Sequence, residues 1–159
     1  MEIAIISDTH NNMANFKKAI EWIKKENIQL ILHCGDISSQ ETIDEAQKFF
    51  GDEADVKFVK GNGDFGLNLP EKLELEIEGK HIAFTHFPGV AKELAQSGKF
   101  DVVFYGHTHK PWQEKIGVPA GGLCQLINPG ELAGQYNKST FAVYDMSTGE
   151  LQLKILEKL

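Results

Sequence analysis

Short β-branched and aromatic runs, each bounded by turn residues, recur along the whole chain and constrain its fold more than any other feature. Each run is too short for a helix, so each is predicted to be a β-strand. Between the first two runs, Phe16, Ile20 and Ile23 recur at helical spacing, which predicts an amphipathic helix. The predicted strands are residues 3–7, 29–33, 56–60, 73–77, 81–85, 101–105, 123–127, 140–144 and 151–156.

The order of these elements indicates a layered α/β domain. Two further helices are expected over residues 41–50 and 90–97, the second closed by Gly98. Strands alternate with helices at the start of the chain, which predicts βαβ units and a parallel sheet, whereas the end of the chain is mostly strand. No linker or internal repeat interrupts the pattern, so residues 1–159 are expected to form a single domain.

Composition and charge exclude several classes of protein. Hydrophobic residues make up 42% of the chain and charged residues 25%, as in globular domains. No apolar run approaches the roughly 18 residues of a membrane span, and we expect no leader peptide, because Met1 and Glu2 lead directly into the first apolar run. We therefore expect a cytoplasmic protein without a membrane partner. Cys34 and Cys124 form no C-x-x-C pair, so reduced thiols are expected.

All 16 basic residues are lysine, and the net charge is -7. This charge repels polyanions, so no extended nucleic-acid partner is expected. Without arginine, the chain has no guanidinium fork with which to clamp a phosphate. A phosphorylated substrate would have to be held by another group.

Polar residues with nitrogen or oxygen donors follow five of the predicted strands. In α/β sheets ligands bind at the carboxyl ends of strands, so these residues should converge. Such donors suit Mn, Fe, Zn, Co or Ni better than Mg or Ca, and their number suits two ions that share a carboxylate. The glycines Gly35, Gly61 and Gly106 precede three donors, where the chain must turn sharply. The donors are Asp8, His10, Asp36, Asn62, His86, His107 and His109.

The same residues carry a resemblance. D-x-H, G-D, G-N-x-D, a single histidine after a strand and G-H-x-H, in this order, resemble the five motifs of the calcineurin-like metallophosphoesterase superfamily. Asn128-Pro129-Gly130 is similar to the small phosphodiesterase branch of that superfamily. The resemblance implies a four-layer α/β/β/α sandwich of two mixed β-sheets flanked by helices, with two metal ions at one end.

The resemblance also implies roles for the donors. It places Asp8, His10, Asp36 and His109 on one ion, and Asp36, Asn62, His86 and His107 on the other. Asp36 bridges the ions, and a hydroxide between them attacks phosphorus, with Asp36, Asn62 and His86 as the catalytic set. Mn²⁺ is the expected ion, and Ni²⁺, Co²⁺, Fe²⁺ and Zn²⁺ are the alternatives.

Three positions depart from the family pattern. Gly63 stands where many members have a histidine that protonates the leaving group, which weakens the case for a monoesterase. Phe87 follows His86 where glycine is common, and it is expected to reshape one wall of the cleft. Glu131 follows the Asn-Pro-Gly segment where serine is common, and the sequence assigns it no role.

Several residues have two interpretations. Asn11 is a candidate substrate-binding residue or part of the start of a helix, and Asp64 orients Asn62 or the substrate, or only shapes a turn. His33 is either a buried core histidine or a hydrogen-bond partner of a ligand such as Asp36. Cys34 is expected to be a packed thiol, Trp112 to lie in a loop, and Asp8 to cap a helix if it is not a ligand.

Together these observations predict a metal-dependent phosphodiesterase acting on a small phosphate ester. The alternatives are a phosphomonoesterase with the same site and a non-catalytic protein-binding scaffold like the retromer subunit of the superfamily. A nuclease is a further alternative that the acidic composition disfavours. A homo-oligomer is also compatible with the sequence.

Overall fold

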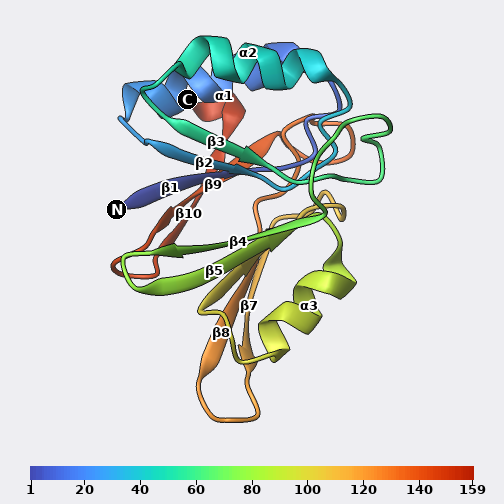
Figure 1. Ribbon diagram of the computed structural model, residues 1–159. Coiled ribbons are helices and arrows are strands. Elements are labelled where there is room, and N and C mark those ends of the chain that lie inside the picture. Colours follow the sequence, from blue (N-terminus) through green and yellow to red (C-terminus); the bar gives the residue numbers. More distant parts are fainter.

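The computed structural model describes residues 1–159, and its ten strands form two five-stranded sheets (Figure 1). The strands are β1 (Glu2–Ile6), β2 (Leu30–His33), β3 (Asp55–Phe58), β4 (Lys72–Ile77), β5 (Lys80–Thr85), β6 (Val102–Phe104), β7 (Trp112–Gly117), β8 (Leu123–Asn128), β9 (Thr140–Asp145) and β10 (Leu151–Ile155). The helices are α1 (Met13–Lys25), α2 (Gln40–Phe50) and α3 (Pro88–Gln96), and a 3₁₀ turn, η1 (Leu156–Lys158), ends the chain.

Each sheet has a parallel centre and antiparallel edges. The first sheet has the order β10-β9-β1-β2-β3, in which β1, β2 and β3 are parallel. The second has the order β4-β5-β6-β8-β7, in which β5, β6 and β8 are parallel. Both sheets are therefore mixed, as expected, and each presents the carboxyl ends of three parallel strands at one edge.

Three separate apolar clusters lie between four layers. Along β1, Ala4 and Ile6 pack under α1 and α2, whereas Ile3 and Ile5 pack against the second sheet. This alternation follows from the two-residue period of a strand with both faces buried. A third cluster joins the second sheet to α3, whose Ala91 and Ala95 are fully buried. The helix, sheet, sheet, helix order of Figure 1 confirms the four-layer sandwich.

The helices begin and end where local chemistry predicts. The side chain of Asn12 accepts a hydrogen bond from the Asn15 amide at the start of α1, so Asn12 rather than Asp8 is the N-cap. Pro88 occupies the first turn of α3, where its missing N–H costs nothing. Gly98 follows the end of α3 with φ +76°, the left-handed geometry that favours glycine. No helix combines the length and apolar character needed to span a bilayer.

One strand, β7, was not predicted from the sequence, and the placement of Trp112 in a loop was wrong because Trp112 begins this strand. Five of its six residues are exposed, so its sequence lacks the apolar alternation that marks a half-buried strand. It forms the edge of the second sheet and is held by antiparallel pairing with β8, in which Trp112 faces Asn128. Its conformation depends on that neighbour rather than on its own pattern.

Candidate metal centre

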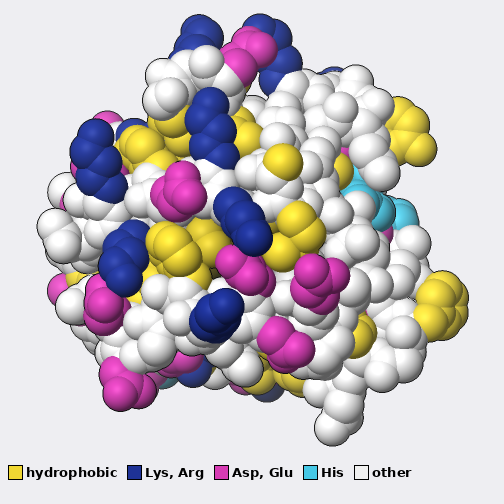
Figure 2. All heavy atoms as spheres, turned by 90° about the horizontal axis from the view of Figure 1, so that it is seen from above, with side chains coloured by type: hydrophobic (Ala, Val, Ile, Leu, Met, Phe, Trp, Pro, Cys, Tyr) yellow, Lys and Arg dark blue, Asp and Glu magenta, His cyan; other side chains and the backbone are white.

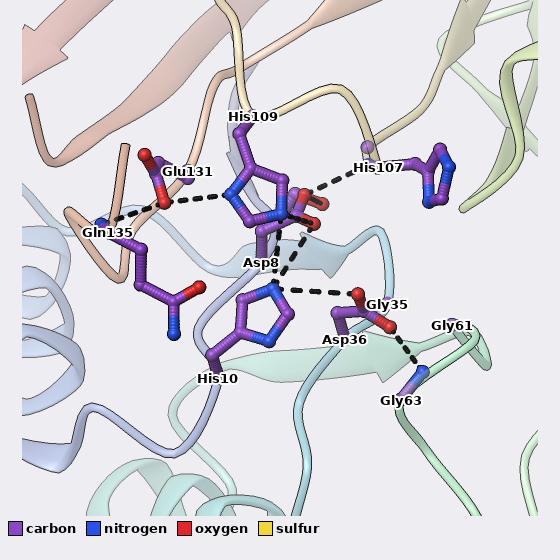
Figure 3. A network of polar contacts seen from close by, with 12 residues as sticks. Asp8, His10, Gly35, Asp36, Gly61, Gly63, His107, His109, Glu131 and Gln135 are labelled. Atoms are coloured by element: carbon purple, nitrogen blue, oxygen red, sulfur yellow. Dashed lines mark hydrogen bonds and ion pairs between the residues drawn. The ribbon is translucent and has the colours of Figure 1, made fainter. Parts of the chain in front are cut away.

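All seven donors predicted from the sequence lie together where the parallel strands of both sheets end. Figure 3 shows five of them: Asp8, His10, Asp36, His107 and His109. Each donor lies on the loop that follows a strand, so the two sheets contribute jointly to one site. Asp8 and His10 follow β1, Asp36 follows β2, Asn62 follows β3, His86 follows β5, and His107 and His109 follow β6.

The first cluster consists of Asp8, His10, Asp36 and His109, whose ligand atoms all lie within 4.8 Å of one another. The Nε2 atoms of His10 and His109 are 3.2 Å apart, and His109 Nε2 is 3.2 Å from Asp8 Oδ1. Ligand atoms about 2.0–2.2 Å from a shared ion stand roughly 3.0–3.6 Å apart. Asp8 Oδ1 is buried and has no hydrogen-bond partner. A divalent cation fits this cluster and would satisfy that oxygen.

The second cluster consists of Asp36, Asn62, His86 and His107. Asn62 Oδ1 is 2.9 Å from both His86 Nε2 and His107 Nδ1, and these two nitrogens are 3.2 Å apart. Asp36 Oδ2 lies 3.4 Å from His86 Nε2 and 3.5 Å from His10 Nε2 of the first cluster. One carboxylate oxygen therefore faces both groups of donors, which would allow it to bridge two ions.

Hydrogen bonds outside the clusters orient the donor atoms. His109 Nδ1 donates to Glu131 Oε2 at 2.8 Å, and His86 Nδ1 donates to the Cys34 carbonyl at 2.8 Å. Each bond places the proton on Nδ1 and leaves the Nε2 lone pair pointing into a cluster. Asp8 Oδ2 accepts hydrogen bonds from the Ser7 hydroxyl and the His107 amide, which leaves Oδ1 for the first cluster.

The charges of the site shift the pKa values of its members. Burial works against ionisation of Asp36, but hydrogen bonds from His86 and the Gly63 amide outweigh it and lower the pKa to about 2. The neighbouring Asp8 raises the pKa of His10. Burial works to lower the pKa of His86, yet Asp36 and Asp8 outweigh it and raise that pKa. The carboxylates therefore favour positive charge at both clusters.

The backbone around the donors is strained and crowded. A Cβ on Gly106 would lie 2.0 Å from Ser7 Oγ, and one on Gly61 would lie 2.2 Å from Asp36 Oδ1, so only glycine fits there. Left-handed backbone at a non-glycine residue costs on the order of 1–3 kcal/mol, and such residues concentrate at functional sites. Five of the seven donors have positive φ: Asp8, His10, Asp36, His107 and His109.

Glu131, to which the sequence assigned no role, is a fully buried part of the site. Besides His109, its carboxylate accepts hydrogen bonds from the backbone amides of Gln135, Tyr136 and Asn137. Burial works to raise its pKa, but these amides and His109 outweigh burial and lower the pKa. The residue follows β8, a parallel strand like those that precede the donors. The rule of polar residues after strand ends could therefore have identified it.

The two substrate-binding candidates lie in different surroundings. Asn11 is exposed beside His10, and its Oδ1 accepts a hydrogen bond from Ser39 Oγ at 2.8 Å. Asp64 is buried, and its two oxygens accept hydrogen bonds from the amides of Asp36, Ser38 and Gly61. This geometry does not fit a substrate contact for Asp64. It favours the orienting role, because Asp64 ties the loop after β2 to the loop after β3.

The remaining residues with two interpretations are part of the core. His33 Nε2 lies 2.7 Å from Thr9 Oγ1, and its Nδ1 accepts from the Gly35 amide, so His33 is a buried core histidine and the alternative, a hydrogen bond to Asp36, is not formed. Burial lowers the pKa of His33 to about 4, which keeps it neutral near pH 7. Cys34 is a fully buried thiol in the cluster between the sheets, as expected.

Solved structures with the same fold include phosphoesterases and a vacuolar protein sorting protein. A structure described as a novel archaeal phosphodiesterase has a TM-score of 0.83 and 30% identity, covering 98% of this chain and 99% of its own. A predicted phosphoesterase of Streptococcus pneumoniae has a TM-score of 0.73 and 22% identity, covering 98% of this chain and 90% of its own. Vps29 of Entamoeba histolytica has a TM-score of 0.69 and 20% identity, covering 97% of each chain. The last two show the fold alone.

Sequence relatives extend this result. Phosphodiesterase MJ0936 of Methanocaldococcus jannaschii is 30% identical, over 99% of this chain and 100% of its own length. The probable metallophosphoesterase MJ0623 of the same organism is 39% identical, over 82% of this chain and 67% of its own length. The model of the calcineurin-like phosphoesterase superfamily domain matches residues 1–149. This chain therefore belongs to the calcineurin-like phosphoesterase superfamily.

Proposed function

We propose that this protein is a metal-dependent phosphodiesterase that hydrolyses small phosphodiesters. The observation that carries the proposal is the position of Asp36 Oδ2, which lies 3.5 Å from His10 Nε2 in one donor cluster and 3.4 Å from His86 Nε2 in the other. Two divalent ions held by these clusters would supply the positive charge that polarises a phosphoryl oxygen and lowers the pKa of a bound water. The 30% identity to an archaeal phosphodiesterase supports the same activity.

The residues of the site divide between orientation and access. Glu131, Asp64 and the Cys34 carbonyl hold donors or donor loops in place from buried positions. Asn62 and His107 are exposed, so the second cluster is the side open to a substrate. Asn11 is also exposed, and in this proposal its amide group donates to a phosphoryl oxygen.

Gly63 favours diesters over monoesters. Its amide donates to Asp36 Oδ1 at 2.7 Å, and it carries no side chain that could protonate a leaving group. Reaction at this site therefore depends on a leaving group that departs without help, as an activated aryl oxide does. Activity toward diesters should fall steeply as the basicity of the leaving group rises.

The test compares hydrolysis of bis(p-nitrophenyl) phosphate with that of p-nitrophenyl phosphate. Protein stripped with EDTA is assayed, then supplied separately with Mn²⁺, Ni²⁺, Co²⁺, Zn²⁺ or Mg²⁺. We expect turnover restored by metal, favouring the diester and highest with Mn²⁺. Preference for the monoester would support the phosphomonoesterase alternative. Absence of turnover with every metal, in protein shown to be folded, would refute the enzymatic proposal and favour a scaffold.

Three further predictions accompany this proposal. The substrate is a small phosphate ester rather than an extended nucleic acid, because the net charge of -7 and the lack of arginine disfavour a polyanion. Cytoplasmic location is supported by two buried cysteines that form no disulfide. Assembly into a homo-oligomer is tested by light scattering.

A further inference from the structure

A small pocket of about 210 Å³ adjoins the open side of the candidate metal centre. Its lining residues are Lys60, Gly61, Asn62, Phe65, Glu71 and Phe87. It includes one proposed metal ligand, Asn62, so a group bound there would lie next to the second cluster. A larger cavity of about 320 Å³ shares Glu71 and Phe87 with the pocket but contains none of the seven donors.

We propose that this pocket binds a planar ring carried by an ester group of the substrate, so that the preferred substrates are phosphodiesters of aryl groups or nucleosides. The inference rests on the proposed phosphodiesterase function and names the substrate class of the same site. Pockets for drug-sized ligands usually measure about 300–1,000 Å³. A volume of about 210 Å³ therefore suits one ring system rather than a larger group.

Two phenylalanines supply the apolar surfaces of the pocket. The Phe87 ring lies edge-on to His86, with centroids 5.2 Å apart, and its centroid is 6.1 Å from that of His107. Phe65 is 90% exposed and buries almost none of its ring within the protein. Figure 2 shows the histidines at one edge of the molecule with hydrophobic side chains protruding beside them. A planar ring bound here would cover apolar surface that otherwise faces water.

The backbone on both sides of the pocket is held in place before any ligand binds. Phe87 is the N-cap of α3, and its carbonyl accepts a hydrogen bond from the Ala91 amide at 2.9 Å. Phe65 follows Asp64, whose carboxylate binds the backbone amides of Gly61 and Asp36. A ring that enters the pocket therefore has to order only side chains, which limits the entropy lost on binding.

Polar groups accompany the two rings. Lys60 and Glu71 also line the pocket, and their charged side chains form no ion pair or side-chain hydrogen bond within the protein. They can bind acceptors and donors on the edge of a ring, as on a nucleobase, without breaking an existing interaction. A plain aryl ring lacks such acceptors and donors, so an aryl ester and a nucleoside ester should differ in how tightly they bind.

The experiment measures binding of phosphonates, which the enzyme cannot hydrolyse, to the Mn²⁺-loaded protein by isothermal titration calorimetry. Methylphosphonate and phenylphosphonate differ in the group on phosphorus, which is a methyl group in the first and a phenyl ring in the second. We expect phenylphosphonate to bind about 2- to 12-fold more tightly, the range for one aromatic contact. Phe65→Ala should reduce this ratio toward one. Phe87→Leu, which keeps apolar bulk beside His86, should do the same.

Tyr136→Ala is the matched control. Tyr136 is 80% exposed, and its ring lies 5.2 Å from that of His109 on the side of the first cluster. The phenyl preference should persist in this variant. The 5′-methylenephosphonate analogue of adenosine monophosphate separates the sources: tighter binding than phenylphosphonate indicates a nucleoside, and weaker binding indicates an aryl group.

Two results would overturn the inference. If both phosphonates bind equally well, or if the phenyl preference survives in both Phe65→Ala and Phe87→Leu, the pocket binds no ring. Metal-dependent turnover of a diester in the same protein would leave the proposed function intact. If no phosphonate binds and no diester is hydrolysed by folded, metal-loaded protein, the proposed function fails as well.

Discussion

Glu131→Gln tests whether a buried carboxylate orients the candidate metal centre. The side chain is fully buried and accepts four hydrogen bonds, from His109 Nδ1 and from three consecutive backbone amides. Glutamine has nearly the same shape but replaces one oxygen with an NH₂ group. At the Oε1 position that NH₂ group would face two amide donors, those of Tyr136 and Asn137, whereas at the Oε2 position it would face only the Gln135 amide and His109 Nδ1, so the Oε2 position is favoured. The substitution therefore changes hydrogen bonding while leaving the packing almost unchanged.

The structure sets the size of the effect. If the new NH₂ group donates to His109 Nδ1, the imidazole proton must move to Nε2, and Nε2 can no longer bind a cation. Loss of such an outer hydrogen bond typically lowers metal affinity about 10- to 100-fold. The Gln135 amide also loses its acceptor, and a buried unsatisfied donor costs about 1–3 kcal/mol. Both losses should appear in the variant.

The assay is titration of metal-stripped protein with Mn²⁺, followed by calorimetry. We expect two binding events in the wild type and, in Glu131→Gln, one of them weakened by about 10- to 100-fold. Denaturant unfolding of the metal-free proteins measures the loss of stability. Glu21→Gln, at an exposed position of α1, is the control and should change neither quantity. Wild-type affinity at both sites in Glu131→Gln would refute the orienting role.

The remaining predictions concern metal sharing, crowding and pH. Asp36→Asn should weaken both bound ions and remove most diester turnover, measured by metal content and kinetics. His81→Ala, at an exposed position of β5 outside the proposed ligand set, should change neither, and equal losses would show that the ligand set is wrong. Gly106→Ala should prevent the site from forming, because its Cβ would lie 2.0 Å from Ser7 Oγ, whereas Gly89→Ala, with no atom within 4 Å, should retain metal binding. His33 has a pKa of about 4 in the folded protein and about 6.5 in the unfolded chain, so between these pH values only the unfolded chain binds the proton. The free energy of unfolding of the metal-free protein should therefore fall by up to about 3 kcal/mol as the pH is lowered from 6.5 to 4. His33→Gln should flatten that part of the unfolding profile, and an unchanged slope would contradict the assignment.

The residues that gather at the candidate site could be singled out from the sequence because the relevant pattern is local. Asp8, Asp36 and Asn62 each follow an apolar run by a few residues, and the carboxyl ends of parallel strands meet at one edge of a sheet. The order of the motifs then indicated the superfamily and its four layers. For the same reason most elements were predicted within one or two residues of their observed ends.

Features that depend on distant partners could not be identified in this way. Strand β7 is exposed and forms only because β8 lies beside it, so its sequence carries no hydrophobic period. Asp64 has the sequence context of a substrate contact, but the folded loops bring the Asp36 amide, 28 positions away, to within 2.9 Å of its carboxylate. A hydrogen bond between distant loops leaves no mark in a single sequence.

The sequence by itself determined the layered fold and the superfamily, and it singled out seven residues that the fold gathers at one edge, because strand period and the residues after strand ends are properties of short segments. Only the tertiary structure decided that Asp36 faces both clusters, that Glu131 holds His109, and that Phe65 and Phe87 line one pocket. The physical reason is the direction of each side chain. That direction depends on how the two sheets and their loops pack together, and residues close in sequence do not specify it.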